Sequence, residues 1–358
     1  EHTGLPARRD DVLMISSSDV DIQCHLGHRG FSSFYKISLL HSKAPNDTYS
    51  LKRIDSDTRK DEALYPPCAI KAALEAEMLS RISHRHVVKV VALHAANTVE
   101  SFDKQRNFVV LDYLVDTLDA KLDEWMLKGK PSKHLFDRLD TVAISVVTGL
   151  TYLHQNNILH RNIRPAAVGF DIHGNCKITD FAIAKDMAVV DALDEKLGGL
   201  AGSPRYMAPE VASKSWYGLA ADVYSFSVLL WEIATLTRPF YTYVHHDKII
   251  SSVLKGERPP MNKVSCKPLK ELIVECWNAD PTSRRSIQSM HKQILQILAD
   301  LENNGNKSSR LLQSKNNDSS DHLPAPPGHK SPRIGRKGLF RRRSTHKSVN
   351  KLDGIDQL

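Results

Sequence analysis

The sequence predicts an α+β fold of two lobes, a small β-rich lobe at residues 21–113 and a larger, mainly helical lobe at residues 114–301. Short β-rich runs around one helical segment predict the first lobe, and apolar residues at three-to-four spacing predict the second. After Leu301 the composition changes to Asn, Ser, Lys, Pro and Gly, which cannot bury enough apolar surface to fold. We therefore expect an N-terminal extension at residues 1–20 and a disordered basic tail at residues 302–358.

Four runs rich in β-branched and aromatic residues predict the strands of the first lobe. A single helical segment, which contains Glu75, interrupts them. The expected arrangement is a small sheet that carries one major helix. The strand runs are residues 34–40, 48–54, 87–93 and 107–114.

The second lobe is predicted to be helical at residues 135–155, 220–236 and 268–277, where apolar residues repeat at helical spacing. The most apolar run, residues 223–236, is too short to cross a membrane and contains Glu232. A buried helix is therefore expected there, and no transmembrane segment is predicted.

Composition and charge indicate a globular protein with reduced cysteines and one strongly basic stretch. The chain has 358 residues, of which 41% are hydrophobic, and this is enough for a real core. Its net charge of +8 comes from residues 328–351, which hold nine Lys or Arg and no acid. The five cysteines form no C-x-x-C pair and have no metal-site spacing, which favours reduced thiols in a cytoplasmic protein.

The basic stretch at residues 328–351 has three interpretations. It can be a solvated disordered run, a nuclear-localisation or nucleic-acid patch, or a segment that adheres to an anionic membrane. The second and third would place the protein in the nucleus or at a membrane surface.

Nine short motifs follow one another in an order that resembles the protein kinase superfamily. Their order and spacing are far more specific than any one of them. The run GSPRYMAPE at residues 202–210 is most similar to the tyrosine-kinase-like group, and residues 108–125 resemble diatom-type members of it. The motifs are LGHRGFSSFYK, YSLK, LEAEMLSRISHRHVV, VLDYL, HRN, DFA, APE, DVYSFSVLLWE and DPTSRR.

The resemblance implies an ATP site with a strand lysine that is paired to a glutamate on the following helix. Two lysines could fill this role, because CAIK, ending at Lys71, also looks like the strand motif. Lys71 lies only four residues before Glu75 and would share its helix face. We therefore predict that Lys52 pairs with Glu75, and that Asp112 and Leu114 form the hinge that contacts adenine.

The glycine-rich loop departs from the family pattern, in which three glycines let backbone amides approach the phosphates. The chain keeps Gly27 in frame and has Gly30 out of frame. Phe34 stands where a valine covers the adenine, and Ser50 stands where an alanine does. A bulkier and more polar site should weaken ATP binding without preventing it.

The catalytic loop has lost two functional groups. The family's catalytic aspartate corresponds to Asn162, whose amide cannot act as a base. The family's metal-binding asparagine corresponds to Ala167, which offers magnesium no side-chain oxygen. Arg164 stands in place of the usual lysine, and Asp180 keeps the remaining metal carboxylate, so magnesium binding is left open.

Residues that support the fold are retained. Glu210 and Arg284 match the family's buried ion pair, and Asp222 matches the carboxylate that holds the backbone of the catalytic loop. His160 and Phe181 are expected in the hydrophobic spine rather than in the chemistry.

The segment between Phe181 and Gly202 contains no Ser, Thr or Tyr, so the usual activating phosphorylation has no acceptor there. Arg161, which would bind such a phosphate, is predicted to pair instead with an acid of this segment. The candidates are Asp191, Asp194 and Glu195.

Three functions remain open. The chain is either a pseudokinase that acts as a scaffold or allosteric partner, or a weakly active Ser/Thr kinase, or an interaction module with an empty pocket. All three imply protein partners or protein substrates.

Overall fold

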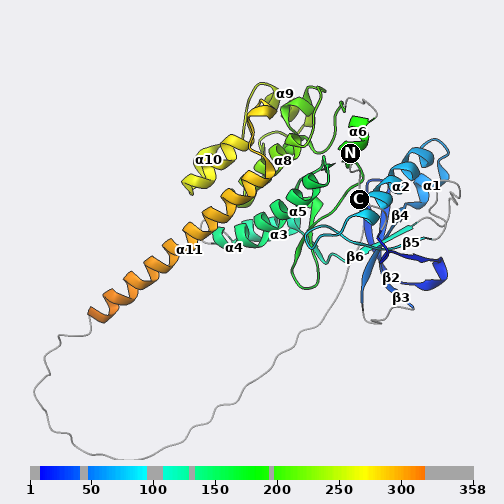
Figure 1. Ribbon diagram of the computed structural model, residues 1–358, viewed down its shortest axis with the longest axis horizontal. Coiled ribbons are helices and arrows are strands. Elements are labelled where there is room, and N and C mark those ends of the chain that lie inside the picture. The colour runs from blue at the N-terminus through cyan, green and yellow to red at the C-terminus, as the bar shows by residue number, and fades with distance from the viewer. Residues whose placement is uncertain (1–8, 41–46, 95–107, 129–133, 193–196, 319–358) are drawn as a thin grey trace, which may run out of the picture. The chain divides into compact units, whose positions relative to one another are not determined.

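The structure is a computed structural model in which the predicted α+β fold of two lobes is confirmed (Figure 1). The chain divides into two compact units, residues 1–307 and residues 308–358, and both lobes lie in the first. The structure describes residues 9–40, 47–94, 108–128, 134–192 and 197–318.

The first lobe is built on a six-stranded sheet with the order β1-β5-β6-β4-β3-β2. The four predicted strands are confirmed. The central strand β6 is buried on both faces: Val109 and Leu111 belong to the core shared with α2, and Phe108 and Val110 pack on the other side. Its continuous apolar run follows from this double burial. The strands are β1 (Leu13–Ile15), β2 (Val20–Arg29), β3 (Ser32–Leu39), β4 (Tyr49–Ile54), β5 (Val90–His94) and β6 (Phe108–Asp112).

The sheet includes residues that were predicted to lie outside it. Strand β1 pairs in parallel with β5, with Leu13 opposite Ala92. Arg9 donates from its backbone amide to Ser80 O at 3.0 Å and from Nη2 to Val90 O at 2.7 Å. Residues 9–20, predicted as an extension of the domain, thus pack against it, and three strand residues are too few to give a periodic signal in the sequence.

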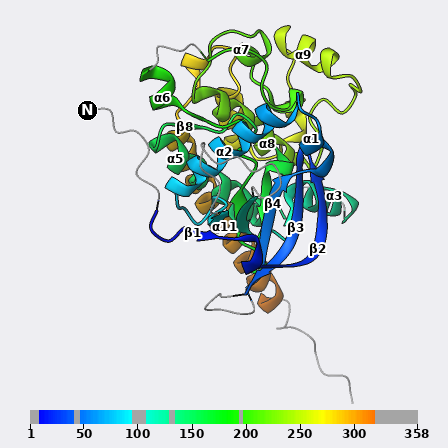
Figure 2. The same ribbon diagram turned by 90° about the vertical axis from the view of Figure 1, so that its right-hand side faces the viewer.

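Helix α2 (Tyr65–Arg81) is the one major helix predicted for this lobe, and it lies across the sheet (Figure 2). A short additional helix, α1 (Ser56–Lys60), precedes it. Asp55 caps α1 by accepting hydrogen bonds from the backbone amides of Asp57 and Thr58.

The second lobe surrounds α8, a helix whose residues 221–235 are all buried. This burial explains why apolar residues occur on every side of α8. No helix among the described residues is long and apolar enough to cross a membrane. The helices are α3 (Leu118–Lys128), α4 (Leu135–Arg138), α5 (Ile144–Gln155), α6 (Met187–Ala192), α7 (Pro209–Ala212), α8 (Ala220–Thr235), α9 (His246–Leu254), α10 (Lys267–Cys276) and α11 (Ile287–Asp318).

Short strands position the loops that carry the predicted site. The catalytic loop joins β8 to β9, and Asp180 follows β10 by two residues. Pairing of β9 with β7 and β10, and of β8 with β11, fixes where these loops begin and end. The strands are β7 (Asp116–Thr117), β8 (Ile158–Leu159), β9 (Val168–Phe170), β10 (Cys176–Ile178) and β11 (Lys185–Asp186).

Helix α11 continues beyond the predicted start of the disordered tail at residue 302, and residues 302–318 are helical. The first turns of α11 are anchored by the buried side chains of Met290, Ile294 and Ile297. Once a helix has formed, each further residue adds a hydrogen bond at little cost, so polar residues can extend it. The basic stretch at residues 328–351 lies outside the described residues.

Candidate functional site

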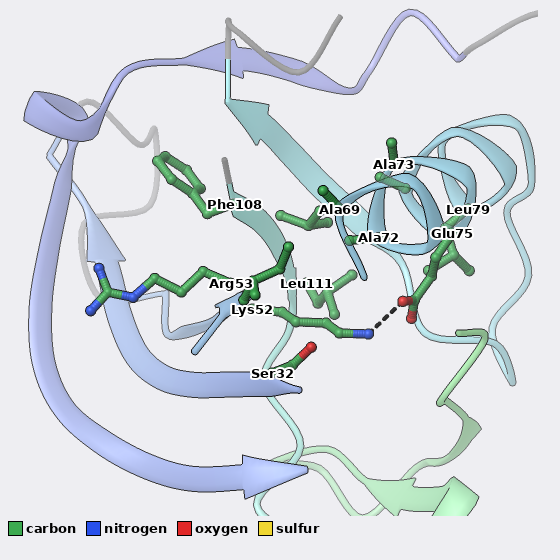
Figure 3. A pocket seen from close by; sticks show the side chains of 13 residues that line it. Ser32, Lys52, Arg53, Ala69, Ala72, Ala73, Glu75, Leu79, Phe108 and Leu111 are labelled. Atoms are coloured by element: carbon green, nitrogen blue, oxygen red, sulfur yellow. Dashed lines mark hydrogen bonds and ion pairs between the residues drawn. The ribbon is translucent and has the colours of Figure 1, made fainter. Parts of the chain in front are cut away.

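Lys52 on β4 and Glu75 on α2 form the predicted ion pair, with 2.5 Å between Lys52 Nζ and Glu75 Oε2 (Figure 3). Their side chains are 11% and 8% exposed, so both charges are largely removed from water. Removing either partner would leave the other buried without compensation. The pair therefore ties the helix to the sheet and directs an ammonium group into the cleft.

The competing lysine, Lys71, lies within α2, so CAIK is helical and not a strand motif. Lys71 is exposed, and it also borders the cleft. Glu77 points elsewhere and pairs with Arg81 at 2.5 Å.

The cleft has two compartments. The first has a volume of about 960 Å³, open solvent included. Five of the residues predicted to contact ATP line it together: Gly27, Phe34, Ser50, Asp112 and Leu114. A space lined by residues of β2, β3 and β4 and by the hinge is suited to a flat heterocycle.

The carboxylate of Asp112 holds the hinge in place. It accepts hydrogen bonds from Lys177 Nζ at 2.7 Å and from the Lys89 backbone amide at 3.0 Å. The Asp112 side chain is thus fixed through Oδ2, and the Asp112 backbone amide donates to Lys89 O at 3.0 Å. The partner lysine on β10 was not identified from the sequence, because it is 65 residues away.

The second compartment has a volume of about 1040 Å³, open solvent included, and Phe34 borders both compartments. Gly30, Lys52 and Asp180, which were predicted as site residues, line this second compartment. Its charged lining residues are four cations and two carboxylates: Arg29, Lys52, Lys71, Arg164, Glu75 and Asp180. The compartment therefore has an excess of positive charge.

The glycine-rich segment forms a tight hairpin in which Arg29 of β2 pairs with Ser32 of β3. Gly27 and Gly30 have φ of +123° and +56°, values that glycine adopts most easily. Arg29 occupies the position of the family's second glycine. Its guanidinium carbon lies 5.8 Å from the centre of the Phe34 ring, and its Nη1 donates to Ala166 O at 3.4 Å.

Asp222 at the start of α8 holds the catalytic loop, as predicted. Its carboxylate accepts hydrogen bonds from the backbone amides of His160 and Arg161 at 2.8 and 2.9 Å. His154 Nε2 lies 3.2 Å from the same carboxylate. Burial acts to raise the pKa of Asp222, but the interactions with His154 and His160 lower it below its ordinary value. The carboxylate is thus kept ionised inside the core.

Asn162, Arg164 and Asp180 form a closed ring of hydrogen bonds. Asn162 Nδ2 donates to Asp180 Oδ2 at 2.8 Å, and Arg164 Nη2 donates to the same oxygen at 3.2 Å. Arg164 Nε donates to Asn162 Oδ1 at 3.2 Å. An aspartate at position 162 could not donate this hydrogen bond and would repel Asp180. The ring therefore exists because the residue is an amide.

Ala167, at the second of the two altered positions, has both of its backbone groups hydrogen-bonded. Ala167 is fully buried, its amide donates to Arg164 O at 2.9 Å, and its carbonyl accepts from Thr179 N at 2.9 Å. Its methyl group offers no ligand to a cation. In the described part of the chain, no group of three or more His, Cys, Asp or Glu side chains could hold a metal. These residues do not fit the magnesium site that the family resemblance implies.

His160 and Phe181 are buried, and their rings meet edge to face at 4.7 Å. His160 Nε2 lies 3.0 Å from Thr179 O. Burial lowers the pKa of His160, which keeps the imidazole neutral. Both residues are part of the core, as predicted.

The predicted partner of Arg161 is wrong where the structure can test it. Arg161 donates to Ile183 O at 3.2 Å and to Tyr217 Oη at 2.5 Å, and it does not pair with Asp191. Its guanidinium also stacks over the Tyr217 ring at 5.4 Å. Asp194 and Glu195 lie outside the described residues.

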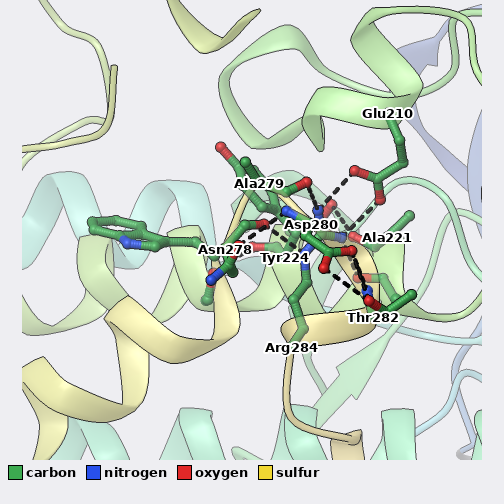
Figure 4. Close-up of polar contacts among 12 residues, drawn as sticks. Glu210, Ala221, Tyr224, Asn278, Ala279, Asp280, Thr282 and Arg284 are labelled. Carbon is green, nitrogen blue, oxygen red and sulfur yellow. Dashed lines mark hydrogen bonds and ion pairs between the residues drawn. The ribbon is translucent and has the colours of Figure 1, made fainter. Parts of the chain in front are cut away.

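The buried ion pair between Glu210 and Arg284 is confirmed (Figure 4). Two parallel hydrogen bonds of 2.7 Å join the guanidinium to the carboxylate. Arg284 also donates to the backbone carbonyls of Asn278 and Ala220, at 2.8 and 2.9 Å. The helical lobe is therefore kept together around a charge network that takes no part in the cleft.

Comparisons with known proteins agree with this geometry. The model of the family described as protein tyrosine and serine/threonine kinase matches residues 20–294. The dual specificity protein kinase shkB of Dictyostelium discoideum is 38% identical over 160 residues, 44% of this chain and 24% of that protein. The serine/threonine-protein kinase STY46 of Arabidopsis thaliana is 25% identical over 304 residues, 85% of this chain and 48% of that protein. The chain thus spans between a quarter and half of the length of these relatives.

Proposed function

Since the chain belongs to the protein tyrosine and serine/threonine kinase family, we propose that it is a pseudokinase. In this proposal the domain binds ATP weakly, transfers phosphate poorly or not at all, and acts as a scaffold or allosteric partner of other proteins. Its motifs favour a diatom-type member of the tyrosine-kinase-like group, and a domain tree that separates it from that group would contradict the placement.

One observation carries the proposal: the side chain at the catalytic-base position donates a hydrogen bond to Asp180. The nitrogen of a carboxamide has no basic lone pair, and its oxygen is too weak a base to take the proton of a substrate hydroxyl. Loss of a positioned general base lowers a rate by about 10²- to 10⁴-fold. The fold-supporting residues Asp222, Glu210 and Arg284 keep their partners, which is what a retained scaffold requires.

A weakly active Ser/Thr kinase is the alternative, and it rests on a different observation. The Lys52–Glu75 ion pair is intact, and Asp180 lines the same compartment. Positioning and electrostatics supply most of the catalysis of phosphoryl transfer, so these groups could retain some activity.

Phosphate transfer by the purified protein separates the two. We expect transfer from radiolabelled ATP to a generic protein substrate to stay at background for the wild type and for Lys52→Met alike. The double variant Asn162→Asp/Ala167→Asn tests whether the rest of the cleft can still support the reaction. Wild-type transfer that Lys52→Met abolishes would establish the weakly active kinase and end the pseudokinase proposal.

Nucleotide binding separates both functions from an interaction module with an empty pocket. A ligand that binds only the folded state raises the melting temperature. We expect ATP to raise it for the wild type and not for Lys52→Met. An unchanged melting temperature at millimolar ATP, with no binding by calorimetry, would favour the empty module.

The basic stretch at residues 328–351 is proposed to hold the protein at an anionic membrane, with nucleic acid or the nucleus as the alternative destination. Each Lys or Arg near an anionic surface contributes about 1 kcal/mol. The full chain should sediment with phosphatidylserine vesicles at low salt, and replacing Arg341, Arg342 and Arg343 by alanine should reduce this. Sedimentation that does not depend on these arginines would count against the proposal.

A further inference from the structure

We propose that this domain binds a nucleoside triphosphate without a divalent cation, with Arg164 and Arg29 supplying the positive charge that a metal ion would otherwise supply. The inference rests on the nucleotide binding proposed above and adds that this binding needs no divalent cation. It comes from three features of the second compartment: its charge, the ring around Asp180 and the position of Arg29.

The charge of the second compartment already suits a free triphosphate. Four cationic side chains and two carboxylates line it, so the compartment is positive before any ligand enters. One of the carboxylates, Glu75, is neutralised by Lys52 at 2.5 Å. A metal ion would add positive charge to a space that lacks the carboxylates to bind it.

The ring around Asp180 engages one oxygen of the carboxylate that a metal would need. Asp180 Oδ2 already accepts hydrogen bonds from Asn162 and Arg164, at 2.8 and 3.2 Å. A cation bound there would have to displace a guanidinium or lie beside it, and like charges repel. Ala167 adds no second oxygen ligand. Magnesium, which binds through one or two carboxylates together with phosphate oxygens and water, would therefore have at most one protein side chain here, and that carboxylate is already paired with a guanidinium.

Arg164 has hydrogen-bonding capacity left for a phosphate. The bonds that the structure describes use its Nε and Nη2, and they leave Nη1 without a partner among the described residues. The side chain is 33% exposed and lines the second compartment. A planar guanidinium held by two neighbours is well suited to a phosphate oxygen, because little conformational freedom is lost on binding.

Arg29 closes the compartment from the opposite side. It lies on β2, at a position where the family has a glycine, and lines both compartments. Its contact with Ala166 O at 3.4 Å shows that the guanidinium reaches across to the other lobe. Two arginines from different lobes thus lie around one space, and Lys52 forms its inner wall.

Calorimetric titration of the full chain with ATP tests the inference, once with excess EDTA and once with magnesium chloride. We expect the dissociation constant in EDTA to be equal to or lower than that in magnesium. Arg164→Ala should weaken binding in EDTA between about 10- and 100-fold, the range for a lost charge-assisted hydrogen bond. Lys60→Ala removes an exposed lysine of α1 outside both compartments and should change nothing.

A variant whose ATP binding should depend on magnesium completes the test. Asn162→Asp/Ala167→Asn restores the oxygen ligand at position 167 and removes the amide donor of the ring, so its ATP affinity should become higher in magnesium than in EDTA. Wild-type binding that appears only in magnesium would overturn this inference and leave the proposed nucleotide binding intact. No binding in either buffer would overturn both.

Discussion

Two aspartates adjoin the catalytic loop, and their surroundings give them opposite roles. Asp222 is fully buried, and its carboxylate is occupied by two backbone amides and by His154. Asp180 is partly exposed, at 26%, and faces the cleft. The first aspartate can only determine the shape of the loop, whereas the second remains able to influence a ligand.

Replacing Asp222 should cost stability rather than ligand binding alone. Asp222→Ala leaves the amides of His160 and Arg161 buried without an acceptor, so the free energy of unfolding should fall by about 2–5 kcal/mol. Asp57→Ala removes a carboxylate that is 91% exposed and should change it by less than about 0.5 kcal/mol. Urea unfolding measures both. Equal losses for the two variants would mean that the hydrogen bonds of Asp222 contribute no net stability.

At the scale of elements, helix α2 meets the sheet with small side chains. A cavity of about 40 Å³ lies between α2, β4 and β6, beside the Lys52–Glu75 pair (Figure 3). Alanines on one side of the helix line this space, and the ion pair adds to the apolar contacts that join the helix to the sheet. The alanines are Ala69, Ala72, Ala73 and Ala76.

Filling this cavity should stabilise the domain. Ala72→Leu adds apolar contact with Leu111, and cavity-filling substitutions commonly add about 0.5–2 kcal/mol. The melting temperature should rise by a few degrees, measured by calorimetry or circular dichroism. Leu74→Ala, on the outer side of the same helix where Leu74 is 59% exposed, should have little effect. A lower melting temperature for Ala72→Leu would show that the space is too narrow for a leucine.

At the scale of the whole molecule, buried ionisable groups give stability a pH dependence of mixed sign. Burial raises the pKa of Glu232 in α8 to about 8 from 4.5, although the hydrogen bond from Tyr206 opposes this shift. Burial lowers the pKa of His160 and His291. Glu232 therefore destabilises the fold as pH rises, and the histidines destabilise it as pH falls below about 6.5.

The variant Glu232→Gln separates these contributions. Between pH 5 and 8 the unfolded carboxyl group has lost a proton that the folded one retains, so wild-type stability falls by at most about 1.4 kcal/mol per pH unit through this residue. The glutamine has no such dependence, and the histidines act equally in both proteins. Glu232→Gln should therefore gain stability relative to wild type as pH rises. A constant difference across this range, measured by urea unfolding, would contradict the raised pKa.

The sequence was informative wherever a pattern was long or a motif was anchored to a known role. Helix α8 is predicted by the spacing of its apolar residues. The Lys52–Glu75 pair is implied by the resemblance to kinase motifs, and the spacing of the residues selects Lys52 over Lys71. Strand β1 was missed because it has three residues, and its partner β5 is far away in sequence. The Arg161–Tyr217 contact spans 56 residues and leaves no local signal. Such contacts depend on how the chain packs.

The ring of Asn162, Arg164 and Asp180 also limits how this lineage can change. A single reversion to aspartate at position 162 would place two carboxylates where a 2.8 Å hydrogen bond now exists, while Ala167 would still offer no ligand. Under the proposed pseudokinase function, that single substitution is expected to lower stability without giving phosphate transfer. Positions 162 and 167 would therefore have to change together before the cleft could carry out the reaction.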